Sequence, residues 1–458
     1  MIRRAADWPH LHHKAVIDED PGTFREMVEV LAKSGCRPQP HRQQKDYPMT
    51  IRSTPKRLFC ASIVTLAVCG FAIPAMALDA DDFATKLSAS ISQSGTRLSF
   101  SEIEPDGSTI TLRSVRADSP GNPSIPFGDV TFNGVEEVND GSYFVNEAVF
   151  GEIEFSEGQN TFSIDGFDVN GLSIPADGAA SSFDSMLDYE GFSTGAIRVV
   201  NNGSTVFSMA GIDLDVVRAD AASRVNMMMT GSDLKIDLGN VKDTKTRDAL
   251  KQLGYETLTG DVKMVGTWDR QSGLIELEDY SLTLDDVGRL SLSLEISGYT
   301  PEFIKAMQQA RSSAASNPDP QDPQAAQQAI DATMREMLQQ LSFKSASVRF
   351  DDASVTERAL DFAGRKQGVS GEQMREFVKF MMPLALGRLG IPALQQQISA
   401  AASIYLDNPQ NITVTATPAQ PVAVPVILGA SMGDPRSLAD LLNLQVIANS
   451  PVEQCCKQ

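Results

Sequence analysis

Short segments in which apolar and polar residues alternate constrain the fold of this chain more than any other feature. They run from about residue 97 to 298, and examples are Ile110-x-Leu112, Ile153-x-Phe155 and Leu234-x-Ile236-x-Leu238. Because successive side chains of a strand point to opposite faces, each segment predicts a strand with one apolar and one polar face. Gly, Asn and Asp separate the segments, which is typical of an antiparallel sheet wetted on one side.

The clearest unit of this kind covers residues 261–298. Val262 sets an alternating phase that continues to Leu277, and the apolar positions then slip to Tyr280. Since one inserted residue turns the following side chains to the other face, the slip predicts a β-bulge near Glu278-Asp279. We therefore expect a three-stranded meander. Its predicted turns are Asp269–Gly273 and Asp285–Arg289.

Residues 301–342 are expected to form a helical hairpin. Thr300 is the predicted N-cap of its first helix, with Pro301 at the first helical position. Residues 308–328 are rich in Gln, Ala, Ser, Asp and Pro, which predicts a flexible loop. The second helix carries apolar side chains on one face over 330–341.

Residues 343–458 are expected to form a helical C-terminal domain with a few strands. Two capping boxes, Ser354-x-x-Glu357 and Ser370-x-x-Gln373, each predict the start of a helix. The second of these helices is expected to stop at Pro383. The other expected elements are a strand from Ser342 to Phe350, a helix from Pro392 to Leu406, a short helix after Asp434-Pro435, and strands at Ile412–Ala416 and Leu444–Ala448.

These patterns predict an α+β fold, in which a mainly helical C-terminal part follows and packs on a long, curved antiparallel β-sheet, a meander. A short helix over residues 78–96 precedes the strands. Both an open, apolar-lined trough and a closed, packed sandwich fit the pattern. The expected parts are residues 1–48, residues 49–77, a β-rich domain over 78–300, the hairpin over 301–342 and the C-terminal domain over 343–458.

Residues 49–77 have the three parts of a secretory signal peptide. A basic stretch follows Met49, an apolar run covers Leu58–Ile73, and Ala75-Met76-Ala77 is a small-x-small cleavage signature. Cleavage after Ala77 would make Leu78 the first residue of the mature chain. We therefore expect a periplasmic protein exported by a cleavable leader that starts at Met49.

The start of the chain leaves alternatives to this interpretation. The apolar run is 16 residues long at most, short of the roughly 20 that span a bilayer as a helix. An uncleaved membrane anchor is still the competing prediction. A lipoprotein would use Cys69, but the bulky Val68 precedes it. Residues 1–48 are interpreted as disordered upstream sequence, translated from a start codon placed too early.

The expected cleavage removes all four histidines and three of the five cysteines. The remaining Cys455 and Cys456 are adjacent, so a structural disulfide between them would be strained. A zinc site is not expected without His and Cys ligands. The mature chain would hold 28 Lys/Arg and 52 Asp/Glu, a net charge of −24 compared with −20 for the whole sequence. Such a charge repels nucleic acid, and no cofactor or metal motif is present.

Three motif matches lack the context that their chemistry needs. Gly191-Phe-Ser193-Thr-Gly195 matches the serine-hydrolase elbow, but a strand is predicted after it and no histidine follows it, so the segment is interpreted as a turn. Ser232-x-x-Lys235 matches the Ser/Lys motif but lies within an alternating strand. The Asp-containing turns do not extend into a calcium loop. Those turns are Asp106-Gly107, Asp140-Gly141 and Asp285-Asp286.

A histidine-free, carboxylate-dependent glycan hydrolase is the alternative function. Carbohydrate sites usually offer aromatic platforms, and the mature chain has a single tryptophan, Trp268. We expect Trp268 to pack in the core against Tyr280. A third hypothesis is an adhesin-like module with calcium-dependent stability. No catalytic residues are predicted.

The C-terminal stretch resembles a group of uncharacterised exported proteins of Gram-negative bacteria. The residues that carry this resemblance are Leu406–Pro409, Ile412–Pro421 with Val422, and Asp434–Leu444 with Ala448-Asn449. The alternating segments before it are more distantly similar to AsmA-like envelope proteins. That resemblance implies long β-sheets that handle lipids between membranes, although the mature chain lacks the membrane anchor usual in that group. No functional residue can be carried over from either group.

The prediction for function is a non-enzymatic periplasmic protein that binds a lipid, another hydrophobic ligand or an envelope partner. A candidate hydrophobic groove is lined by side chains at helical spacing on one predicted helix. These side chains are Met374, Phe377, Val378 and Met381.

Overall fold

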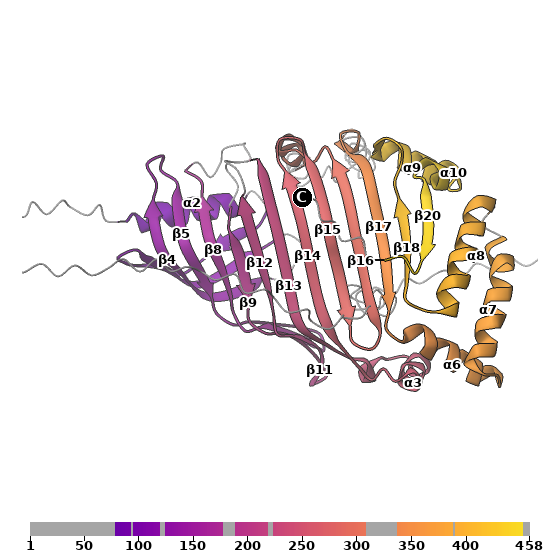
Figure 1. The fold of residues 1–458 in the computed structure, drawn as a ribbon. Helices are drawn as coiled ribbons and strands as arrows, with labels where there is room; N and C mark the ends of the chain where they lie inside the picture. The colour runs from indigo at the N-terminus through magenta and orange to yellow at the C-terminus, as the bar shows by residue number, and fades with distance from the viewer. Residues whose placement is uncertain are drawn as a thin grey trace, which may run out of the picture.

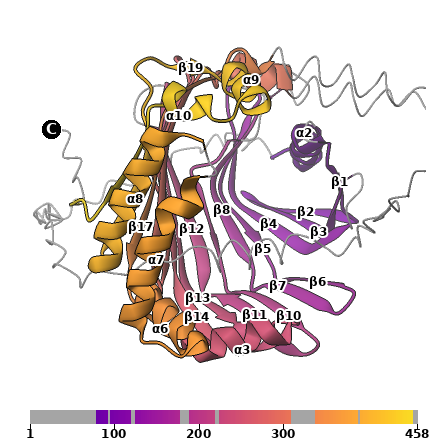
Figure 2. The same cartoon turned by 90° about the vertical axis from the view of Figure 1, so that its right-hand side faces the viewer.

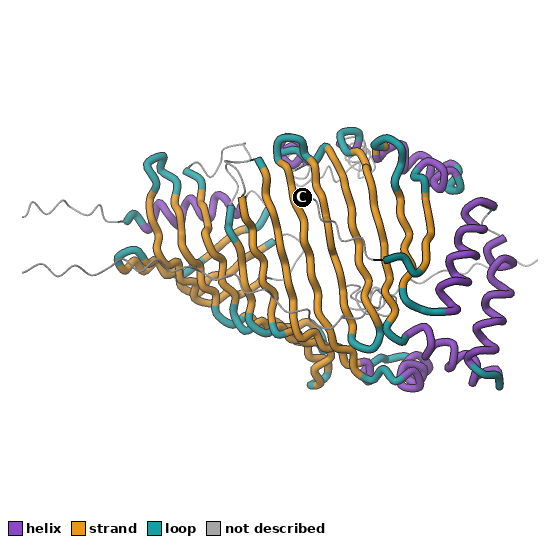
Figure 3. Tube along the Cα trace, in the orientation of Figure 1, coloured by secondary structure: helices purple, strands orange, loops and turns teal. Residues whose placement is uncertain are grey.

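The computed structural model describes residues 78–92, 95–119, 124–176, 188–218, 223–307, 337–387 and 390–451. Strands dominate up to residue 297, and the helices gather near the C-terminal end (Figures 1 and 3). The helices are α2 (Ala80–Ser92), the short 3-10 helix η2 (Leu238–Asn240), α3 (Thr244–Leu253), α6 (Val355–Gln367), α7 (Gly371–Leu386), α8 (Pro392–Asp407), α9 (Val424–Gly433) and α10 (Ser437–Leu441). The signal-peptide residues Ala75 and Ala77, the loop over 308–328 and the cysteine pair lie outside the described residues.

The strands follow the predicted alternation closely. They are β1 (Arg97–Ser99), β2 (Glu102–Asp106), β3 (Thr109–Asp118), β4 (Ile125–Glu137), β5 (Tyr143–Phe150), β6 (Ile153–Glu157), β7 (Asn160–Ile164), β8 (Phe167–Ile174), β9 (Gly191–Thr194), β10 (Ile197–Asn201), β11 (Ser204–Met209), β12 (Gly211–Arg218), β13 (Arg224–Asp237), β14 (Thr257–Asp269), β15 (Leu274–Leu284), β16 (Gly288–Ser297), β17 (Ser342–Asp352), β18 (Asn411–Ala416), β19 (Val422–Ala423) and β20 (Leu444–Ala448).

All twenty described strands belong to one antiparallel sheet that does not close into a barrel. The longest path of neighbours runs β2-β3-β4-β5-β8-β9-β12-β13-β14-β15-β16-β17-β18-β20. The predicted C-terminal strands therefore extend the sheet as its last members. The α+β prediction is confirmed, and the sheet is open.

The predicted meander is formed by β14, β15 and β16, and it contains the predicted bulge. Val265 lies opposite Asp279, whereas the next residue, Gly266, lies opposite Leu277. Glu278 is the inserted residue, so Leu277 and Tyr280 point to the same side of the sheet.

The sheet bends sharply along a line that crosses its N-terminal half. Here β5 and β6, β7 and β8, β9 and β10, and β11 and β12 follow one another with only one or two residues between them. Figure 2 shows the hairpins β6–β7 and β10–β11 turned away from β8 and β12. A Cβ atom on Gly195 would lie 2.4 Å from the carbonyl oxygen of Asp165. The backbones can approach this closely at the bend because glycine has no side chain.

Helix α2 packs on the inner side of the bent sheet near its N-terminal edge (Figure 2). The Phe83 ring is fully buried and makes edge-to-face contacts with Phe132 and Tyr143, with centroids 5.1 and 5.4 Å apart. The Tyr143 hydroxyl donates a hydrogen bond to Asp82 at 2.8 Å. Together these contacts hold α2 on the sheet.

Two further cores support the rest of the sheet. One lies at the bend, where Phe207, Ile236 and Leu258 pack together and Leu253 of α3 joins them. The other joins the C-terminal helices to the sheet through Leu360, and its other buried members are Met374, Tyr405 and Leu406. The predicted packing of the helical part on the sheet is confirmed.

The structure corrects three local predictions. Ser354 does not cap α6, because its hydroxyl donates instead to the carbonyl of Asp286 at 2.5 Å. Helix α7 does not stop at Pro383 and continues to Leu386. Met382 packs in the C-terminal core, and such packing stabilises a last turn that proline alone would disfavour.

Trp268 does not pack against Tyr280. Its indole nitrogen donates to the carbonyl of Tyr299 at 2.8 Å, and the two rings meet edge to face. Tyr280 lies opposite Met264 and is 47% exposed. The capping box at Ser370 and the N-cap at Thr300 are both present.

Candidate functional site: the apolar face of the sheet

One side of the sheet carries an unbroken row of apolar side chains, one from each strand of the longest path. Each residue lies directly opposite the next in register. The row is Pro105, Ile110, Phe132, Ala148, Val169, Phe192, Leu214, Met229, Met264, Tyr280, Leu292, Val348, Val414 and Val446. We call this side the apolar face.

Among the described helices, α2 covers the N-terminal end of the apolar face, α6 to α8 cover the other end, and α3 packs at the bend. At the N-terminal end α2 buries the row, and Ile110 and Ala148 are fully buried. At the other end α6, α7 and α8 pack near Phe350. Between these ends Tyr280, Val348 and Val414 are 47%, 42% and 41% exposed. We call the part of the apolar face from β13 to β18 the open section.

The rows on both sides of this central row are also apolar across the open section. One consists of Met227, Gly266, Leu277, Leu294, Ala346 and Ala416. The other consists of Val262, Leu282, Leu290, Phe350 and Ile412. This second row is partly covered, because Val262 and Leu282 pack against the core at the bend and Phe350 and Ile412 pack against the C-terminal core. With a strand spacing of about 4.8 Å, six strands make a field about 24 Å wide.

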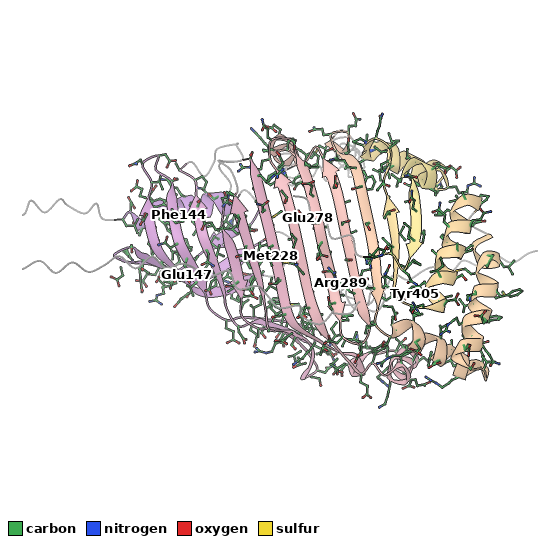
Figure 4. The ribbon with its side chains drawn as sticks, viewed as in Figure 1. Phe144, Glu147, Met228, Glu278, Arg289 and Tyr405 are labelled. Atoms are coloured by element: carbon green, nitrogen blue, oxygen red, sulfur yellow. The ribbon has the colours of Figure 1, made fainter. Side chains whose placement is uncertain are left out.

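The opposite side of the same strands is mostly polar. Its central row consists of Thr230, Lys263, Ser281, Ser291, Arg349 and Thr413. Figure 4 shows the sheet from the side opposite α2, with Met228, Glu278 and Arg289 labelled. Arg289 forms an ion pair with Asp279 at 2.7 Å on this side. The sheet is therefore amphipathic, and the apolar face is not shared with a second sheet layer among the described strands.

The residues of the candidate groove on α7 do not line one surface. Met374 is buried and Val378 packs beside it in the C-terminal core. Phe377 is 51% exposed, and Met381 is half-buried. Leu78, the expected first residue after cleavage, packs against the core beneath α2.

The structure places both serine motifs in strands, which corrects the turn predicted at residues 191–195. Ser193 belongs to β9, and the strand β10 follows it directly. Ser232 lies at the irregularity of β13 between Gly231 and Leu234, with no helix after it. Asp140 accepts hydrogen bonds from both the backbone and the hydroxyl of Ser142. Within the described ranges, no group of His, Cys, Asp and Glu side chains could hold a metal ion.

Two acidic residues on the polar side interact electrostatically. Burial, and then the nearby Glu147, raise the pKa of the Asp168 carboxyl. Glu147 in turn accepts a hydrogen bond from the amide of Asn133 at 3.2 Å. This pair lies on the side of the sheet away from the apolar face and shows no nucleophile beside it in the described hydrogen bonds.

A buried polar group fastens α8 to the start of α6. The Tyr405 hydroxyl lies 2.5 Å from the hydroxyl of Thr356 and donates to Asp352 at 3.1 Å. Burial is the main reason that the pKa of Tyr405 is raised. The Thr356 hydroxyl and the Tyr405 hydroxyl both bond to the same oxygen of the Asp352 carboxylate, so we assign this group to packing.

Sequence reasoning missed the apolar row as a site. The signal was present in the apolar phase of each strand, but the register that aligns fourteen strands depends on pairings far apart in the chain.

Comparison with known proteins finds similarity in the C-terminal part of the chain. A family model described as "Uncharacterized protein" matches residues 281–449, which run from the end of β15 to just after β20. This agrees with the resemblance of the C-terminal stretch to uncharacterised proteins. No curated protein matches the chain. Among the described helices, none is long and apolar enough to cross a membrane.

Proposed function

We propose that this protein binds a lipid, or another molecule with a long apolar chain, on the open section of the apolar face. The observation that carries the proposal is the exposure of Tyr280, Val348 and Val414 at the centre of three adjoining apolar rows. Large contiguous apolar patches on a protein surface usually mark a binding site.

The chemistry of the open section favours a hydrocarbon chain over a sugar or a nucleotide. Apart from the Tyr280 hydroxyl, its three rows present no polar side chain. A flat, apolar surface gains binding energy by removing hydrocarbon from water, roughly 25 cal/mol per Å². The field of about 24 Å is long enough for an extended acyl chain. No catalytic role is included in the proposal.

Export is part of the proposed function. The leader expected over residues 49–77 would deliver the protein to the periplasm, where lipids need a carrier to leave a membrane. The distant resemblance of the strands to AsmA-like envelope proteins supports the same role. The carrier function rests on these two expectations, whereas binding itself rests on the apolar face.

The test is binding of a fluorescent fatty-acid probe to the purified protein and to two matched variants. Val348→Asp places a carboxylate in the open section, and Ser347→Asp places the same group on the polar side of the same strand. A carboxylate buried against hydrocarbon is strongly unfavourable, so Val348→Asp should weaken binding about tenfold or more. Ser347→Asp should change the affinity for the probe by less than about twofold.

Two results would contradict the proposal. One is no saturable binding of the probe by the unmodified protein. The other is an equal effect of both variants at unchanged circular dichroism, which would place the probe elsewhere.

A further inference from the structure

Helix α7 exposes a ridge of large apolar side chains that the cores do not use. Phe377, Phe380 and Leu384 are 51%, 79% and 71% exposed. Their spacing of three and four residues places them along one side of the helix. We call these three residues the α7 ridge. On α9, Met432 is 88% exposed as well.

The charge of the chain is divided unevenly between the sheet and the helical end. Residues 78–354 contain 20 Lys/Arg and 44 Asp/Glu, whereas residues 355–451 contain seven of each. Residues 377–386 of α7 contain no acidic side chain. The Lys379 ammonium, within that stretch, is bound to Asp407 and Glu376. The helical end is therefore the electrically neutral end of an acidic protein.

We propose that the α7 ridge docks the protein on the surface of a zwitterionic lipid bilayer. Exposed Phe and Leu side chains on a helix enter the boundary between headgroups and acyl chains. An anionic surface would repel the acidic sheet, but a zwitterionic surface carries no net charge to repel it. The inference concerns a second surface and does not depend on ligand binding at the open section.

A second copy of the chain fits the ridge less well than a bilayer does. Two copies of the chain, each with a net charge of −20, repel each other on approach, whereas a zwitterionic bilayer does not repel the chain. Figure 1 shows α7 and α8 beyond β20, at the end of the sheet, where a flat surface can approach. In this orientation the open section ends close to the proposed lipid surface.

Flotation of the purified protein with phosphatidylcholine vesicles tests the inference. The variant is Phe380→Ser with Leu384→Ser, and the matched control is Val217→Ser, which is 59% exposed on the polar side of β12. The ridge variant should bind the vesicles at least about tenfold more weakly than the unmodified protein, because two large apolar side chains are lost. The control should bind within about twofold of the unmodified protein. Any leader that is retained is common to all three proteins.

Vesicles with half of the lipid replaced by phosphatidylglycerol should bind less protein at low salt. Equal flotation of the ridge variant and the control would overturn the inference. So would a dimer that the ridge variant converts to monomer while no vesicle binds. A protein that floats but fails to bind the fatty-acid probe overturns only the proposed function, and the reverse result overturns only the ridge.

Discussion

At the scale of single residues, the bend in the sheet depends on glycine. Gly195 donates its backbone N–H to the carbonyl of Gly166 at 2.9 Å, and the two strands meet here with no room for a side chain. Gly166 also has a positive φ of 81°, which side-chain-bearing residues rarely adopt. The bend brings β10 and β11 into the core that α3 joins.

Replacement of Gly195 by alanine should destabilise the fold. Its Cβ would lie 2.4 Å from the Asp165 carbonyl oxygen, so the backbones must separate, at a cost of about 2 kcal/mol or more. Gly151→Ala is the matched control, because a Cβ at Gly151 meets no atom within 4 Å. Urea unfolding followed by circular dichroism measures both. Equal midpoints would show that the close approach does not matter.

The local errors of the sequence analysis also arise at this scale. The capping box at Ser354 failed because the Asp286 carbonyl, 68 residues earlier, takes its hydroxyl. Trp268 and Tyr280 lie on the same face of the sheet, but the register places them on different rows. Neither the distant acceptor nor the register can be read from local spacing.

At the scale of elements, α2 is held on the sheet by a charged contact as well as by its apolar side. The hydrogen bond from Lys86 lowers the pKa of the Asp82 carboxyl below its usual range, and the hydrogen bond from Tyr143 lowers this pKa by a smaller amount. A carboxyl with a lowered pKa in the folded state stabilises the fold above its unfolded pKa, about 4. That contribution is lost as the pH falls through the folded pKa.

Asp82→Asn should therefore reduce stability at pH 7 by about 1 kcal/mol, a modest value because the pair is partly exposed. The difference in melting temperature between Asp82→Asn and the unmodified protein should shrink as the pH falls below about 4. Asp81→Asn, on the exposed side of the first turn, is the control. A difference that stays constant down to pH 2 would contradict this role.

The local spacing of apolar residues was enough to predict individual strands and helices. The alternating phase places β13 to β16 correctly, and its slip at Glu278 predicts the bulge. The prediction of a groove on α7 was only partly informative, because it did not separate buried from exposed residues. An apolar stripe shows which residues share a helix but not which of them turn to the core, so Met374 is buried and Phe377 is exposed.

At the scale of the whole molecule, the sheet is open and amphipathic, with described helices at both ends and α3 at the bend. The apolar rows are continuous only because fourteen strands pair in one register. Such long-range pairing is non-local information, and sequence spacing alone left both a trough and a sandwich open. The match to uncharacterised proteins over 281–449 includes Val348 and Val414 of the open section.

The most direct test of the central claim is photo-crosslinking at two positions of equal exposure on opposite sides of the sheet. Tyr280 on the apolar face is 47% exposed, and Met228 on the polar side is 46% exposed. Each is replaced in turn by p-benzoylphenylalanine, the protein is irradiated in cells, and adducts are identified by mass spectrometry. Our account predicts lipid adducts at position 280 and few at position 228. Equal labelling at both positions, or no lipid adduct at position 280, would contradict it.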